Sequence, residues 1–316
     1  MSVLKNIFIN RAQSRLRAGW RILIYFLSFF LIAALANFIL KKSFPVEIIR
    51  RLATFLVIPL IAFGTLWLAA RFLDHRKFED YGFHLSRRWW LDFLFGLALG
   101  AFLFSVIFIC EKAMGWIAIT GYFQNQKDGY IGLPFVIPLL MGLMLCVLVG
   151  LYEEFLFRAN LLTNLSEGLN KRSAMPSKAV AWAYILSSLA FGLAHSLNPN
   201  AALVGVINII LGGLFIGLPF VLSGELAASI ALHISWNFFQ GLFFGFPVSG
   251  VFENTSVIAI KQGGPQIWTG GAFGPEGGLI GSLAIILGCI FVWLWFRVLK
   301  RPIALFNELA EYHSLK

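Results

Sequence analysis

An all-α polytopic membrane protein of about eight transmembrane helices is the fold that the sequence predicts. Of its 316 residues, 59% are hydrophobic and only 13% are charged. Soluble domains are usually near half apolar and a quarter charged. The mean hydropathy is +0.81. Apolar stretches of about 20 residues, the length needed to cross a bilayer, recur along the whole chain.

Eight segments meet this length requirement, and each is expected to form one helix. They lie near residues 20–40, 52–72, 91–110, 136–163, 179–197, 202–222, 225–246 and 279–299. Between the last two, residues 247–278 contain KQGGPQIWTGGAFGPEGG. Glycine and proline at this density predict turns, not a span. We divide the chain into residues 1–134 with about three spans, 135–246 with about four, and 247–316 with an outer loop, the last span and a tail.

The basic residues predict how the chain is oriented, because cytoplasmic loops are enriched in Lys and Arg. With both termini in the cytoplasm, roughly 18 of the 25 basic residues fall on the inner side. The same residues explain the net charge of +10 without nucleic acid as a partner, since they cluster beside apolar spans. We expect an integral protein of a bacterial inner or plasma membrane, with the lipid bilayer as its surroundings.

Three cysteines, Cys110, Cys146 and Cys289, all fall in apolar segments. An odd number at this depth argues against a disulfide framework. None of them has a nearby Cys or His at the spacing of zinc ligands.

The first group of charges that needs an explanation is EEFLFR, residues 153–158. Charge inside a membrane helix is costly and suggests a functional site. Glu154 and Arg158 are four residues apart, so they lie about 40° apart around a helix and can form an ion pair. Glu153 lies about 140° from Arg158 and is left without this partner, free to act as a base. Alternatively, both glutamates only hold the bundle together through Arg158.

Two further polar groups lie on later spans. FGLAH, residues 191–195, ends with His195, and such a histidine at a span end is often only interfacial. HISWN, residues 233–237, places His233 and Asn237 on one side of a helix, where both can donate to a single oxygen. They can also bond to each other or to a neighbouring helix.

Depth along the helices indicates whether these groups can meet. If the fourth span continues to about Gly168, Glu153 lies about 22 Å above its inner end, and His195 lies about 25 Å up its own helix. His233 and Asn237 come out at about 12 and 18 Å, near enough for a tilted helix. If the fourth span ended at Arg158, Glu153 and His195 would lie on opposite sides of the membrane.

EEFLFR, FGLAH and HISWN match EExxxR, FxxxH and HxxxN, in this order and on separate apolar helices. In this the chain resembles the CPBP family of intramembrane proteases, which includes CAAX prenyl proteases and bacterial abortive-infection or bacteriocin-processing proteins. The resemblance covers about residues 135–246, which would then be the catalytic core. The stretch GGAFGPEGG also resembles a C-terminal feature of some bacterial members.

The resemblance implies hydrolysis of a peptide bond in a membrane-associated or lipidated peptide or protein. Glu153 would be the general base, and His195 would help it to bind and polarise water. His233 and Asn237 would form the oxyanion site, while Glu154 and Arg158 orient the helix. We expect a glutamate mechanism with no cofactor. Zinc is the alternative, with Glu153, His195 and His233 as ligands, but the sequence has no HExxH and Asn is a poor zinc ligand.

Two other functions remain open. Intramembrane carboxylates and histidines also serve proton-coupled transporters. A transporter would favour charges spread along a path across the bilayer and paired repeats, whereas here the charges form one group and the sequence shows no internal repeat. A non-catalytic scaffold or bacteriocin immunity protein would bind a peptide without cutting it, and an intact motif set argues against this.

Overall fold

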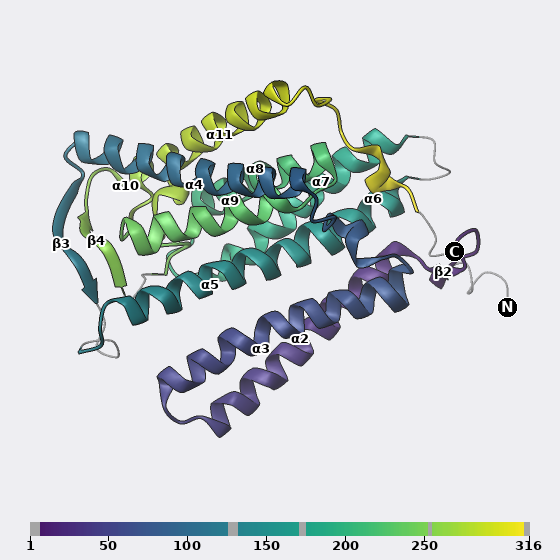
Figure 1. The fold of residues 1–316 in the computed structure, drawn as a ribbon, viewed down its shortest axis with the longest axis horizontal. Helices are drawn as coiled ribbons and strands as arrows, with labels where there is room; N and C mark the ends of the chain where they lie inside the picture. The colour runs from purple at the N-terminus through teal and green to yellow at the C-terminus, as the bar shows by residue number, and fades with distance from the viewer. Residues whose placement is uncertain (1–6, 126–131, 171–174, 252–254, 313–316) are drawn as a thin grey trace.

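The computed structural model describes residues 7–125, 132–170, 175–251 and 255–312, and in this part of the chain helices form an elongated bundle (Figure 1). Seven of these helices are long and apolar enough to cross a membrane. They run over Ala18–Ser43, Ile49–Asp74, Arg87–Ala113, Val136–Leu169, Pro176–Leu197, Leu203–Ser223 and Leu279–Val298. The predicted fold class, an all-α polytopic membrane protein, is therefore confirmed.

Several of these membrane-length helices are composed of more than one element. The elements are α2 (Ala18–Ser43), α3 (Glu47–Leu68) with the π-helical η1 (Ala69–Asp74), α4 (Arg87–Ala113), α5 (Val136–Glu154) with the π-helical η4 (Phe155–Leu162) and α6 (Thr163–Leu169), α7 (Pro176–Ala194) with the 3₁₀ turn η6 (His195–Leu197), α8 (Leu203–Ser223) and α11 (Leu279–Val298). A short 3₁₀ turn, η2 (Phe78–Tyr81), precedes α4.

The seventh expected span, near residues 225–246, is a shorter helix at the centre of the bundle (Figure 1). It consists of 11 residues, Ala227–Asn237 (α9), continued by six residues of π-helix, Phe238–Phe243 (η7). Every α9 residue from Ala227 to Trp236 is buried. Protein, rather than lipid, therefore surrounds the helix that carries the HISWN motif.

Two glycines of α4 allow α9 to come close. A Cβ atom on Gly96 would lie 2.6 Å from the carbonyl oxygen of Ala228, and one on Gly100 would lie 2.7 Å from the Cβ of Ser235. Small residues four apart let two membrane helices pack backbone to backbone. The position of α9, and with it His233 and Asn237, depends on this contact.

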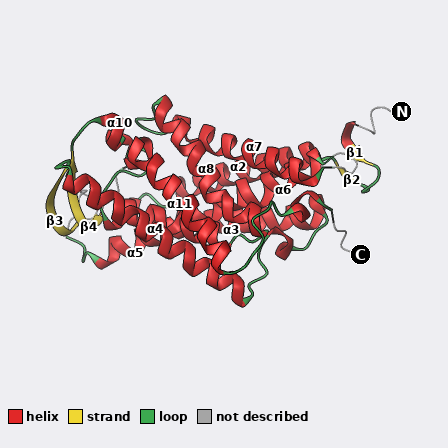
Figure 2. Cartoon of the chain, turned by 90° about the horizontal axis from the view of Figure 1, so that it is seen from above, coloured by secondary structure: helices red, strands yellow, loops and turns green. Residues whose placement is uncertain are grey.

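A two-stranded antiparallel ribbon closes one end of the bundle (Figures 1 and 2). It pairs β3 (Ile117–Asn125) with β4 (Thr255–Gln262), with Ile117 opposite Gln262 and Asn125 opposite Thr255. The expectation of turns alone over residues 247–278 is therefore wrong for β4. The pairing joins segments more than 100 residues apart, which local glycine and proline content does not reveal.

The remaining short elements lie at the two ends of the bundle. They are α10 (Gln266–Thr269), η8 (Gly271–Phe273), η9 (Pro275–Gly277), β1 (Ile9–Asn10), β2 (Arg15–Leu16) and η10 (Asn307–Ala310). The strands β1 and β2 lie at the end opposite β3 and β4 (Figure 2). The guanidinium of Arg15 stacks over the Tyr312 ring at 3.5 Å, and Asn170 donates to the Ala310 carbonyl at 3.0 Å. The two terminal segments therefore meet at this end.

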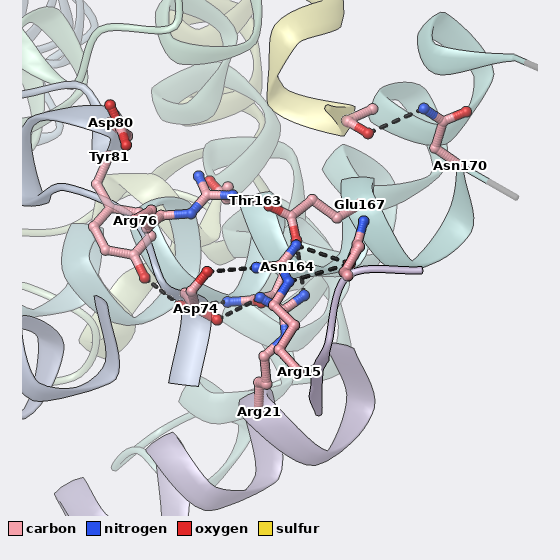
Figure 3. Close-up of polar contacts among 12 residues, drawn as sticks. Arg15, Arg21, Asp74, Arg76, Asp80, Tyr81, Thr163, Asn164, Glu167 and Asn170 are labelled. Atoms are coloured by element: carbon pink, nitrogen blue, oxygen red, sulfur yellow. Dashed lines mark hydrogen bonds and ion pairs between the residues drawn. The ribbon is translucent and has the colours of Figure 1, made fainter. Parts of the chain in front are cut away.

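A buried ion cluster anchors the hairpin of α2 and α3 at the same end (Figure 3). Arg15 and Arg21 both donate to Glu167 Oε2 at 2.7 Å, and Arg76 also pairs with Glu167. Arg21 reaches Asp74 as well. All five side chains are at most 8% exposed. Glu167 belongs to the long helix that carries Glu153. The cluster therefore fixes the hairpin to the C-terminal part of that helix.

Two uncharged side chains complete the cluster. Asn164 donates to Asp74 Oδ2 at 3.2 Å, and the Tyr81 hydroxyl donates to the same oxygen. Burial, together with the charge of Asp74, raises the pKa of Tyr81 well above its ordinary value. The hydroxyl therefore stays protonated and remains a donor to Asp74.

Candidate active site

The helix that carries EEFLFR does continue through the site, as the depth argument requires. Helical backbone runs without a break from Val136 to Leu169, 34 residues. Glu153 and Glu154 are the last residues of α5, and the π-helical η4 begins at Phe155. Such π-helical turns within α-helices are frequent at functional sites. The alternative, a helix ending at Arg158, is excluded.

Glu154 forms the ion pair that its spacing predicts. Its Oε1 accepts from Arg158 Nη1 at 3.0 Å, and neither side chain is more than 1% exposed. Arg158 Nη2 also donates to the Gly213 carbonyl of α8 at 2.8 Å, and its guanidinium lies over the Phe191 ring, 4.6 Å from the centroid. The predicted pair is confirmed, and it links the long helix to α7 and α8.

A second partner of Glu154 does not follow from its helix position. The same Oε1 atom lies 2.9 Å from Nδ1 of His233 on α9. A buried carboxylate that accepts from Nδ1 fixes the ring and leaves Nε2 to face the other way. Here Nε2 of His233 lies 3.7 Å from Oε2 of Glu153. Glu154 thus orients His233 toward the neighbouring glutamate.

Glu153 faces a different set of groups, as helix geometry predicts. Its Oε2 lies 3.8 Å from Nε2 of His195 and 3.7 Å from Nε2 of His233. Its Oε1 accepts from the Tyr152 hydroxyl at 3.2 Å. The Glu153 side chain is 13% exposed, whereas that of Glu154 is fully buried. The accessible carboxylate therefore faces two imidazoles and has no cationic Lys or Arg partner among the described residues.

His195 faces the same cavity as Glu153, and its side chain is 16% exposed. It follows the last residue of α7, and its Nδ1 lies 2.8 Å from the Phe191 carbonyl oxygen. A carbonyl only accepts, so Nδ1 carries the proton and the Nε2 lone pair faces Glu153 in the neutral ring. FGLAH thus supplies both the histidine and, through Phe191, the carbonyl that orients it.

The four candidate catalytic residues line one cavity of about 450 Å³. They are Glu153, His195, His233 and Asn237. Most of the remaining wall is apolar or aromatic, from α2, α5, α7, α8 and α11. The structure thus brings together all three motifs, and their catalytic roles stay predictions. The sequence left open whether His233 and Asn237 act as a pair or bond to a neighbouring helix, and His233 does contact Glu154 of the long helix.

Sequence reasoning missed some residues of this site. Tyr152, next to the two glutamates, donates to Glu153. Glu276 of the GPEGG stretch lines the cavity from a segment more than 100 residues further along the chain, and Asn208 of α8 lines it too. In the sequence, GPEGG is visible as a motif and Asn208 as one polar residue in an apolar stretch. Neither signal shows which cavity the side chain reaches.

The donor set can be compared with the needs of zinc. A glutamate and two histidines are suitable ligand types, and both rings are oriented through Nδ1 as metal-binding histidines usually are. Within the described ranges, however, no group of three or more His, Cys, Asp or Glu side chains has an arrangement that could hold a metal ion. We therefore derive no step through zinc, and the metal-free mechanism stays a prediction.

Comparison with known proteins agrees with the motifs. Residues 135–239, which make up 105 of the 316 residues, match the family model described as type II CAAX prenyl endopeptidase Rce1-like. The matched region contains EEFLFR, FGLAH and HISWN, so the resemblance inferred from them is confirmed. No curated protein and no solved structure matches the chain. Together with the seven apolar helices, the match supports an integral membrane protease.

Proposed function

We propose that this protein is an intramembrane endopeptidase that hydrolyses a peptide bond of a membrane-associated or lipidated substrate, with a glutamate as the base. One observation carries the proposal. The Glu153 carboxylate faces the Nε2 atoms of His195 and His233 inside a largely apolar cavity. An accessible carboxylate beside two oriented imidazoles, enclosed by a helix bundle, suits the activation of one water molecule.

The first step is attack by water. Separations of 3.7 and 3.8 Å are too long for direct hydrogen bonds, so a water that lies to one side of these groups in the cavity can contact the carboxylate and an imidazole together. Glu153 takes one proton from this water while its oxygen attacks the substrate carbonyl carbon. His195 accepts a hydrogen bond from the same water through the lone pair of Nε2 and holds the water in line.

The negative charge that develops on the carbonyl oxygen needs donors. The Asn237 amide supplies two N–H groups without any change of protonation. His233 donates through Nε2 when its ring carries both protons, and the ring's charge then lies beside the Glu154 carboxylate. The proton held by Glu153 passes to the leaving amine as the carbon–nitrogen bond breaks. The products are one carboxylic acid and one amine, and the base is restored.

The cavity and its surroundings support a substrate that is presented by the membrane. Aromatic and aliphatic side chains form most of its wall, and it lies between helices of membrane-crossing length. We propose that both termini lie in the cytoplasm of a bacterium, because the terminal segments share one end of the bundle and most basic residues fall on that side.

Hydrolysis in water enriched in ¹⁸O tests the proposal. The protein is reconstituted in liposomes with lipid-anchored peptide libraries, and the products are read by mass spectrometry. We expect one ¹⁸O atom in each new carboxyl group with the wild type and no product with Glu153→Gln. Equal cleavage by a folded Glu153→Gln protein would overturn the assignment of Glu153 as the base.

A further inference from the structure

The segment Gly271–Gly277 reaches the cavity through one side chain, Glu276. The segment contains η8 and η9 and precedes α11 at the ribbon end of the bundle (Figure 1). Glu276 is only 6% exposed and lines the same cavity as Glu153. The mechanism proposed above does not use it.

The backbone around Glu276 is fixed by close packing. Gly274 has a φ of +107°, and a Cβ atom there would lie 2.2 Å from the Pro247 carbonyl oxygen. A residue with a side chain is excluded by both the conformation and the contact. In addition, Asn208 of α8 donates to the Gly278 carbonyl at 2.9 Å. The carboxylate is therefore held at one place in the wall.

Three donors already bind the Glu276 carboxylate. Oε1 accepts from the backbone N–H of Ser249 and from its hydroxyl at 2.9 Å. Oε2 accepts from Trp236 Nε1 at 3.2 Å, and Trp236 lies between His233 and Asn237 on α9. An ionised carboxylate offers about four acceptor positions, so one on Oε2 is still open.

None of these donors is charged. Within the described part of the chain, no ion pair involves Glu276, and no Lys or Arg side chain lines the cavity. The cavity thus holds two carboxylates, Glu153 and Glu276, in a mostly apolar wall. A carboxylate in such surroundings favours binding of a cationic group from a ligand, because the attraction between opposite charges is stronger where the dielectric constant is low.

We propose that Glu276 is a specificity subsite that binds a Lys or Arg side chain of the substrate close to the bond that is cleaved. The inference rests on the proposed function for its location and names a substrate class, a peptide with one basic residue beside an apolar segment. The open acceptor position of Oε2 receives the N–H of that residue. Ser249 and Trp236 keep the carboxylate in place when the substrate leaves.

A lysine scan tests the subsite. The probes are palmitoylated decapeptides in which one position at a time carries Lys or its uncharged analogue norleucine. We expect Lys at one position to raise kcat/KM about 10- to 100-fold over norleucine with the wild type. Glu276→Gln should lose this preference and still cleave the norleucine peptides, whereas Glu276→Asp should retain part of the preference.

The matched control is Glu111→Gln. Glu111 is fully buried at the ribbon end, accepts from Gln262 at 2.8 Å and does not line the cavity. The preference for Lys should survive this change. The subsite is overturned if Glu276→Gln lowers cleavage of Lys and norleucine peptides equally, or if the wild type shows no preference.

Binding separates this inference from the proposed function. The same peptides are titrated onto Glu153→Gln protein with and without Glu276→Gln. Tighter binding of the Lys peptide that requires Glu276, with no cleavage by the wild type, would support the subsite and overturn the protease. Cleavage that requires Glu153, without a charge preference in either assay, would overturn the subsite and leave the protease.

Discussion

Nδ1 of His233 lies 2.9 Å from Oε1 of Glu154, although 79 residues separate them in the chain. The same oxygen receives Nη1 of Arg158 at 3.0 Å. One buried carboxylate thus joins the long helix of EEFLFR to α9, and through Arg158 also to α8. Glu154 and Glu153 are neighbours in sequence, but the first is surrounded by partners and the second faces the cavity.

Glu154→Gln should impair both stability and activity. Arg158 and His233 already share Oε1 of Glu154, and a neutral amide oxygen would bind both more weakly, so the buried guanidinium would lose its counter-charge. We expect the free energy of unfolding to fall by about 3 kcal/mol. Cleavage should fall with it, because His233 loses the group that orients its ring. Thermal unfolding in detergent and kcat/KM measured below the new midpoint check this, and a variant as stable as the wild type would contradict it.

Glu153→Gln should abolish cleavage without a comparable loss of stability. Its carboxylate lies 3.7 Å or more from both imidazoles, and among the described residues only the Tyr152 side chain donates a hydrogen bond to it. The variant should therefore unfold at nearly the wild-type temperature while its cleavage falls below detection. The two variants serve as matched controls for each other, because the same substitution is made at adjacent positions. A large loss of stability in Glu153→Gln would instead favour a structural role for the residue.

Asn237→Ala should act mainly on kcat. Asn237 lines the cavity one residue after the Glu276-bound Trp236, and its amide is the donor that needs no protonation. Removing one oxyanion donor typically lowers kcat about 100- to 1,000-fold. We expect this loss with KM nearly unchanged, measured by steady-state kinetics on one peptide. An unchanged kcat would remove Asn237 from the oxyanion site.

Removing metal ions should leave cleavage unchanged. The proposed base is Glu153, and the described residues contain no group arranged to hold a metal ion. Activity measured after prolonged treatment with 1,10-phenanthroline and after dialysis against EDTA checks this expectation. A loss of activity that added Zn²⁺ restores would replace the metal-free mechanism with one that uses Glu153, His195 and His233 as ligands.

The sequence was informative where one helix sets the geometry. The 100° turn per residue separated Glu153 from the Glu154–Arg158 pair, and the rise per residue placed Glu153 and His195 at one depth. It was uninformative where distant segments meet. The Glu154–His233 contact, the pairing of β3 with β4 and the entry of Glu276 into the cavity all join residues that lie far apart in the chain. No local periodicity encodes such contacts, since they depend on how helices pack.

The buried ion cluster gives the last prediction. Glu167 is the common acceptor for Arg15, Arg21 and Arg76 at the end of the long helix. Glu167→Ala would leave these guanidinium groups with Asp74 as their main counter-charge, in a place water does not reach. Breaking a buried pair in this way costs about 3–5 kcal/mol.

The matched control is Glu79→Ala, because Glu79 pairs with Lys77 at 3.2 Å on the surface, where both side chains are at least half exposed. Exposed pairs contribute about 0–1 kcal/mol, so this variant should unfold like the wild type. Glu167→Ala should lower the thermal midpoint and release the hairpin of α2 and α3, which is checked by hydrogen exchange over Ala18–Leu68. Equal midpoints for the two variants would show that the cluster does not hold the hairpin. The cavity wall that α2 supplies would then need another anchor.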